Sequence, residues 1–168
     1  MDSNSIKQAL AEIREIETEW KKKANNAAKE VCREIAEQIR ANLEYIPYTD
    51  DMINVATHEI IQKKDTLGVW NLTETNNGCM VSITGKDIVF VEFGAGIYHN
   101  SNGNDNPLAE SVSFETGIGS YGKGQGSQPY WFVAHNLISR GTPMYMPIYR
   151  AILAVKPEIP TIVKRVFV

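Results

Sequence analysis

The sequence predicts an α+β fold in which helices occupy both ends of the chain and antiparallel strands lie between them. Apolar residues recur at the helical period over residues 5–45 and again after residue 143, whereas residues 54–84 alternate and contain a hairpin turn. At 168 residues the chain has the usual size of one domain. We expect a single domain, 1–168, made of a long helix (5–45), a hairpin sheet with the segment Val-Glu-Phe-Gly (54–93), a flexible loop (94–128), and a strand with C-terminal helices (129–168).

The first helix is predicted to be long. Its apolar face recurs in steps of three and four residues, through Ile6, Leu10, Ile13, Ile16, Trp20, Ala24, Ala27, Val31, Ile35, Ile39 and Leu43. It should end before Pro47, because a residue that precedes proline avoids the helical region. About 40 residues at about 1.5 Å each give a helix about 60 Å long, longer than a compact domain of this size is wide. We therefore expect the helix to project, to bend near residues 24–27, or to pack on another chain.

The middle of the chain reads as strands. Residues 54–63 alternate loosely, and residues 67–74 and 79–84 flank the turn Thr75-Asn76-Asn77-Gly78. Asn-Gly tolerates the positive φ that tight hairpin turns require, so these two segments are predicted to pair. Asp87 is placed to cap a helix, but the apolar run from Ile88 to Phe93 fits either a short helix or a buried strand.

Eight of the twelve glycines lie between residues 94 and 126. Because glycine loses much backbone freedom on ordering, we expect a long surface loop there, with one short strand near residues 111–116. Residues 129–133 should form a strand and residues 139–142 a turn. Thr142 and Pro143 suit the cap and first position of a C-terminal helix, which Lys156-Pro157 should break or kink before an amphipathic tail.

Composition excludes several classes of protein. A net charge of −3 is unlike the basic footprint of a protein that binds nucleic acid through phosphates. No apolar run approaches the roughly 20 residues that a membrane helix needs, and the charged N-terminus lacks the apolar centre of a signal peptide. We therefore expect a protein made in a cytoplasm, with Cys32 and Cys79 as buried or free thiols rather than a disulfide.

Motifs for cofactors and metals are weak or absent. Residues 117–122 spell G-x-G-x-x-G, but Lys123-Gly124-Gln125-Gly126 follows, which cannot begin the helix that a dinucleotide site requires. The three histidines share no metal-ligand spacing with one another or with the cysteines, and no HExxH or CxxC occurs. We expect no cofactor and no metal, with His135 at the end of a helix or strand.

Glu92 is the best candidate for a catalytic carboxylate, because it stands alone where an apolar run meets Gly94-Ala95-Gly96. Sugar hydrolysis needs a second carboxyl group about 5 to 9 Å away across a cleft, and nothing in the sequence supplies that cleft. The favoured hypothesis is structural: Glu92 accepts hydrogen bonds from backbone N–H groups of the Gly94–Gly96 turn and fixes it.

Three segments together resemble a family of bacteriophage proteins. The first is Val91-Glu92-Phe93-Gly94-Ala95-Gly96, where the family commonly has threonine in place of Ala95. The second is residues 141–147, Gly-Thr-Pro-Met-Tyr-Met-Pro, in which Pro143 and Pro147 hold the family's proline positions before a C-terminal helix. The third is residues 48–52, where Asp50 replaces the glycine expected after the first long helix. In order, the segments resemble the head–tail joining or tail-completion proteins of long-tailed phages and prophages, also called minor tail or neck proteins.

The resemblance implies a structural subunit for virion assembly and not an enzyme. It implies long helices packed on a small, mainly antiparallel sheet, a homo-oligomeric ring, and head-connector and tail-tube proteins as partners. The location it implies is the virion neck or tail, reached through the cytoplasm of the bacterial host, with no membrane and no specific nucleic acid bound. Charge segregation agrees with a head-to-tail interface: residues 46–126 hold ten acids and four bases, whereas residues 127–168 hold one acid and five bases.

Aromatic residues spaced through the glycine-rich loop are candidates for partner contact, since aromatic side chains commonly anchor interfaces. This candidate set comprises Tyr98, His99, Phe114 and Tyr121. Two other functions stay open. A small hydrolase of cell-wall sugar would use Glu92, and a small-ligand binding module would use Tyr130, Trp131 and the glycine loop.

Overall fold

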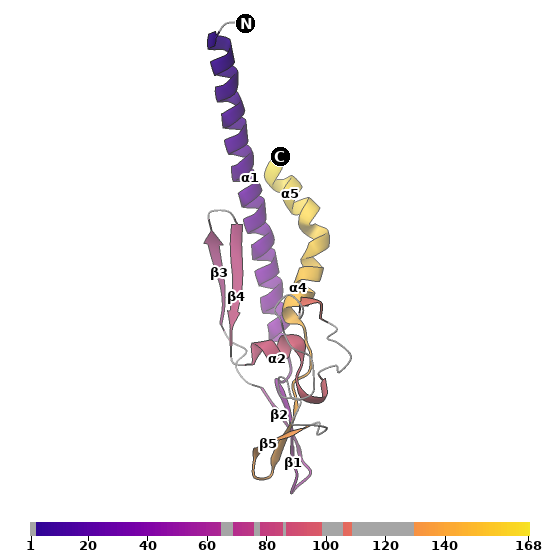
Figure 1. The fold of residues 1–168 in the computed structure, drawn as a ribbon. Coiled ribbons are helices and arrows are strands. Elements are labelled where there is room, and N and C mark those ends of the chain that lie inside the picture. The colour runs from indigo at the N-terminus through magenta and orange to yellow at the C-terminus, as the bar shows by residue number, and fades with distance from the viewer. Residues whose placement is uncertain (1–2, 65–68, 76–77, 86, 99–105, 109–129) are drawn as a thin grey trace.

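The computed structural model describes residues 3–64, 69–75, 78–85, 87–98, 106–108 and 130–168. It confirms the α+β architecture, with a long N-terminal helix, C-terminal helices and a small antiparallel sheet. The helices are α1 (Ser3–Glu44), α2 (Ile88–Phe93), α4 (Pro147–Val155) and α5 (Ile159–Phe167). In Figure 1, α1 forms the long axis of the molecule, and α4 and α5 run along one side of its C-terminal half.

The helix α1 confirms the predicted long helix almost to its ends, with 42 residues and a stop just before Ile46-Pro47. Its two halves differ in their surroundings. In residues 23–44, here called the α1 base, Ala27, Ala36 and Ile39 are buried. In residues 3–22, here called the α1 tip, all described side chains from residue 5 onward are exposed. The helix therefore projects beyond the rest of the fold, as Figure 1 shows.

The predicted hairpin is confirmed as β3 (Val69–Thr75) paired antiparallel with β4 (Gly78–Thr84), and it lies along α1. Cys32 of α1 and Cys79 of β4 form a disulfide, with Cα atoms 6.2 Å apart, a normal span for such a bond. The prediction of unpaired thiols is therefore wrong. Sequence spacing could not reveal the pair, because the two cysteines are 47 residues apart and meet only once the hairpin folds back along the helix.

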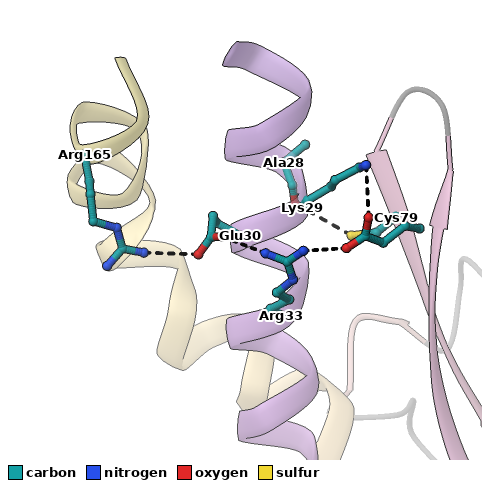
Figure 2. A network of polar contacts seen from close by, with 7 residues as sticks. Ala28, Lys29, Glu30, Arg33, Cys79 and Arg165 are labelled. Atoms are coloured by element: carbon teal, nitrogen blue, oxygen red, sulfur yellow. Dashed lines mark hydrogen bonds and ion pairs between the residues drawn. The ribbon is translucent and has the colours of Figure 1, made fainter. Parts of the chain in front are cut away.

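Ion pairs at the surface also join α1 to β3 and to α5 (Figure 2). Lys29 of α1 lies 3.0 Å from the Glu74 carboxylate of β3, which Arg33 also contacts. Glu30 lies 2.7 Å from Arg33 and 3.4 Å from Arg165 of α5, so the network runs from α5 across α1 to β3. The bond from Lys29 lowers the pKa of Glu74, and the bond to Glu74 raises the pKa of Arg33. Since these groups are exposed, salt screens them, and packing carries more of the attachment.

A four-stranded antiparallel sheet lies near the C-terminal end of α1 (Figure 1), in the order β2-β1-β6-β5. Its strands are β1 (Asp50–Asn54), β2 (Ile60–Lys63), β5 (Trp131–Ala134) and β6 (Leu137–Gly141). Residues 54–63, which alternate loosely in the sequence, comprise the end of β1, a turn and β2. The expected turn at residues 139–142 is mostly strand β6, because the chain already reverses at His135-Asn136. His135 does lie at a strand end, as predicted.

The predicted helix start at Thr142-Pro143 is wrong by four residues, since α4 begins at Pro147. Backbone groups in between are used elsewhere: the Thr142 carbonyl accepts from Ala95, and the N–H of Tyr145 donates to the Val91 carbonyl at 2.9 Å. The predicted break at Lys156-Pro157 is confirmed as a short 3-10 turn, η2 (Lys156–Glu158), before α5. Within the part of the chain that the structure describes, no helix is long and apolar enough to cross a membrane.

Candidate functional site

Glu92 lies at a buried junction of three segments. Its side chain comes from α2 and is 2% exposed. One carboxyl oxygen, Oε2, accepts from the backbone N–H of Ile148 at 2.8 Å. The other, Oε1, accepts from the N–H of Tyr149 at 3.1 Å and from the Asn106 side-chain amide at 2.6 Å. The junction therefore ties α2 to the start of α4 and to residues 106–108.

This arrangement supplies acceptors to backbone N–H groups at the start of α4 that have no partner within the helix. The first N–H groups of a helix have no partner within the helix, and a polar side chain just before it usually accepts from them. Here Met146 occupies that position and Pro147 the next, and no side chain caps the helix locally. Glu92 supplies the acceptor from another element, and its carboxyl group also faces the positive end of the helix dipole.

The hypothesis that Glu92 has a structural role is thus retained with a different set of partners. The sequence suggested that Glu92 accepts hydrogen bonds from the Gly94–Gly96 turn, but in the structure it accepts from other donors. The N–H of Gly94 donates to the Phe90 carbonyl at 2.7 Å and that of Ala95 to the Thr142 carbonyl at 2.9 Å. The turn is held by backbone bonds, which leaves the carboxyl group for α4.

Two glycines cross at the same junction. A Cβ atom added to Gly96 would lie 2.0 Å from the Arg140 carbonyl oxygen, and one added to Gly141 would lie 2.0 Å from the Ala95 carbonyl oxygen. Both glycines also have positive φ, of 66° and 118°, where other residues are strained. The crossing brings the segment after α2 against β6, so the two main motifs of the phage resemblance meet in space.

Tyr98 was expected in a loop that contacts partners, and the structure places it within the fold. Its hydroxyl donates to Asp51 Oδ2 of β1 at 2.6 Å, and Arg140 Nη1 lies 3.7 Å from the same oxygen. Burial, with the bond to Asp51, raises the pKa of Tyr98 above its usual range. Burial also raises the pKa of Tyr145, whose ring packs edge-on against Tyr48, to about 12. For residues 94–98 the expectation of a free surface loop is therefore wrong, since Gly94, Ala95 and Gly96 are buried.

The remaining candidates divide into those near this junction and those that cannot be placed. Val91 and Phe93 are buried beside Glu92, and Pro147 is buried at the start of α4. Pro143 lies in the extended segment before it, half-buried. His99, Phe114, Tyr121 and the expected strand at 111–116 lie outside the described residues.

Sequence reasoning missed two members of the site, Asn106 and Asp51. Asn106 is 1% exposed and is followed by Pro107, a pair that signals a turn but not a bond to Glu92. Asp51 is 5% exposed, although it stands in a strand with a second acid beside it. Neither residue could be assigned before the partners of Glu92 and Tyr98 were known.

A largely apolar pocket of about 450 Å³ borders the junction. It lies between α1, β4, α2 and α4, and its wall includes Ile39, Val81, Ile88, Phe93 and Ile152. Glu92 contributes to this wall, but its carboxyl oxygens are directed to the donors on α4 and Asn106. Of the two residues expected around a small ligand, Tyr130 is not among the described residues that line this pocket, and the side chain of Trp131 lies outside what the structure describes.

Among the described residues no group of three or more histidine, cysteine, aspartate or glutamate side chains is arranged to hold a metal ion. Comparison with known proteins gives no relative: no family model, no curated protein and no solved structure matches the chain.

Proposed function

We propose that the chain is a structural subunit of a bacteriophage or prophage neck or tail. In this role it joins the head connector to the tail tube, or completes the tail, as one copy in a ring. The observation that carries the proposal is the contact between the two motif segments: Glu92 of the first segment caps the helix that begins at Pro147 of the second. Because the two motif segments form one buried junction, their contact supports a resemblance to the phage family in fold as well as in sequence.

The geometry of Glu92 also favours this proposal over a hydrolase. A general acid or nucleophile must reach substrate, whereas the Glu92 side chain is 2% exposed and both of its oxygens accept from protein donors. The carboxyl group is thus fully used in holding two helices together. A helix that projects from the fold supports assembly as well, since the α1 tip presents a long surface that the chain itself leaves exposed.

Co-expression tests the proposal. The chain is produced together with head-connector and tail-tube proteins of the same phage or prophage, and complexes are purified through a tag on one partner. We expect co-purification of a ring-shaped complex, seen by light scattering and electron microscopy. If the chain stays separate from both partners, the proposal fails. Release of sugar fragments from cell walls by the native chain, lost in Glu92→Gln, would favour the hydrolase instead.

The apolar pocket supports a second candidate, the binding of a small apolar ligand. Its volume of about 450 Å³ lies in the range of ligand sites. A panel of small apolar molecules should then raise the melting temperature of the native chain. The shift should be lost in Ile88→Phe, which fills the pocket from α2, provided that this variant melts cooperatively.

A further inference from the structure

The apolar face of α1 continues past the point where the rest of the fold covers it. Five large side chains of the α1 tip share this face and are 49–62% exposed: Ile6, Leu10, Ile13, Ile16 and Trp20. We call them the tip stripe. They continue the row that is buried farther along the same helix, for example at Ala27 and Ile39. A row of this length is more than the scattered exposed apolar residues that any protein carries.

The packing of α5 on α1 extends as far as Trp20. The ring of Phe167, in the last turn of α5, packs against Trp20 with centroids 5.5 Å apart, and Lys23 Nζ reaches the Phe167 carbonyl. Beyond this contact, the four residues of the tip stripe that precede Trp20 are 49–59% exposed. In Figure 1, α1 extends past the α5 ribbon in this direction. Those residues are thus available to another molecule.

Charges on the two flanks of the tip stripe indicate which molecule. At about 100° per residue, Lys7, Arg14 and Lys21 fall on one flank, because steps of seven residues return to nearly the same side of a helix. Glu12 and Glu19 fall on the opposite flank by the same spacing. Two of these side chains also form ion pairs within the helix: Lys21 with Glu17, which lies nearer the stripe, and Glu19 with Lys23 of the α1 base. The tip therefore has a basic flank and an acidic flank, separated by apolar side chains.

Opposite flanks meet only when two such helices run in the same direction. A two-fold axis perpendicular to the helices makes them antiparallel and brings each flank against its own kind, so that like charges repel. Rotation about an axis along the helices, in a parallel pair or a ring, brings the basic flank of one copy against the acidic flank of the next.

From this charge pattern we infer that the α1 tip packs against the α1 tip of a second copy of this chain, with both helices in the same direction. The inference identifies the surface and the orientation of contact between copies. It deepens the ring proposed above, but a parallel dimer would also satisfy it. Self-association of the chain can be measured without any partner protein. Its failure is therefore distinct from failure to join a neck complex.

Charge-reversed variants test the contact. Glu12→Lys/Glu19→Lys gives the tip two basic flanks, and Lys7→Glu/Arg14→Glu/Lys21→Glu gives it two acidic flanks. By sedimentation equilibrium, each variant alone should self-associate about tenfold more weakly than the native chain, or worse. An equimolar mixture of the two should recover association. Glu37→Lys, a reversal at an exposed position of the α1 base, should leave it unchanged.

Direction is tested with Ile6→Cys and a short bis-maleimide. In parallel helices residue 6 of one copy lies beside residue 6 of the next, so a covalent dimer should form. In an antiparallel pair centred on the tip stripe, residue 6 would lie opposite residue 20, about 21 Å along the helix from its own counterpart. A native chain that stays monomeric at about millimolar concentration, reversed variants that associate like the native chain, or associated Ile6→Cys that does not cross-link would each overturn the inference.

Discussion

The two halves of α1 have the same apolar pattern and opposite surroundings. In the α1 base, Ile39 is 2% exposed, whereas in the α1 tip, Ile13 is 59% exposed, although both lie on one continuous row of the helix. The base is covered by α4, α5 and the β3–β4 hairpin, which is fastened to it by a disulfide and ion pairs. Periodicity therefore identifies which face of a helix is apolar but not what covers that face. Stability should reside in the base, whereas the tip should contribute little to the stability of the monomer.

The largest expected effect is at the base. Ile39→Ala removes a fully buried side chain where α1 meets the apolar pocket and should lower the free energy of unfolding by about 3 to 4 kcal/mol. Urea denaturation followed by circular dichroism measures the loss. A change below about 1 kcal/mol would mean that the base is not tightly packed, and the contrast between the halves would disappear.

Substitution of Glu92 should have the next largest effect. Glu92→Ala leaves the N–H groups of Ile148 and Tyr149 without their acceptor and should cost about 2 to 3 kcal/mol. Glu92→Gln keeps one oxygen acceptor and should cost about 1 kcal/mol. Thermal and urea melts of both variants check the order, with Glu37→Ala on the exposed face of α1 as a control. Equal or increased stability in both variants would contradict the structural role.

Alkaline pH should weaken the packed part of the fold. All seven tyrosines lie outside the α1 tip, and Tyr98 and Tyr145 have raised pKa values. A tyrosine with a higher pKa in the folded chain keeps its proton after the unfolded chain has lost it. The free energy of unfolding should therefore fall as pH rises from 10.0, the ordinary value, toward the pKa of about 12 for Tyr145.

Absorbance of tyrosinate and circular dichroism, recorded in one titration, measure this effect. We expect part of the tyrosine absorbance to appear only as the fold is lost. In Tyr98→Phe and Tyr145→Phe, the late fraction should shrink. If all tyrosines titrate near their ordinary pKa while the fold persists, burial does not raise these two values.

The smallest expected effect on stability is at the tip. Ile13→Ala, the same substitution as in Ile39→Ala, should change the free energy of unfolding of the monomer by no more than about 0.5 kcal/mol, because the side chain is already exposed. Measured at dilution, its urea transition should overlay that of the native chain. A loss like that of Ile39→Ala would show that the tip is covered in the monomer.

Local patterns predicted the elements whose signals are local. The long helix and its end just before Ile46-Pro47, the pairing of β3 with β4, and the break at Lys156-Pro157 all follow from backbone preferences of adjacent residues. The run Ile88–Phe93 was ambiguous because a short apolar segment suits a helix or a strand, and it forms α2.

Features that depend on distant partners were not predictable. Thr142-Pro143 reads as a helix start, but Thr142 bonds to Ala95, and the helix begins only at Pro147. Glu92 reads as the clamp of the nearby glycine turn, yet it accepts from a helix 56 residues farther along. The cysteine pair likewise depends on the path of the hairpin. In each case a strong local preference was overruled by a contact that forms only in the complete fold.

The projecting half of α1 acts mechanically as a lever. The α1 tip is about 30 Å long, so a tilt of about 10° at Trp20 would displace its far end by about 5 Å, half the diameter of a helix. The contact between Trp20 of α1 and Phe167 of α5 is the point about which the tip would pivot. A neighbour that grips the far end would sense small rotations of the packed fold as large displacements. The packing of α1 against α5 in the base would thus limit how accurately the tip is aligned.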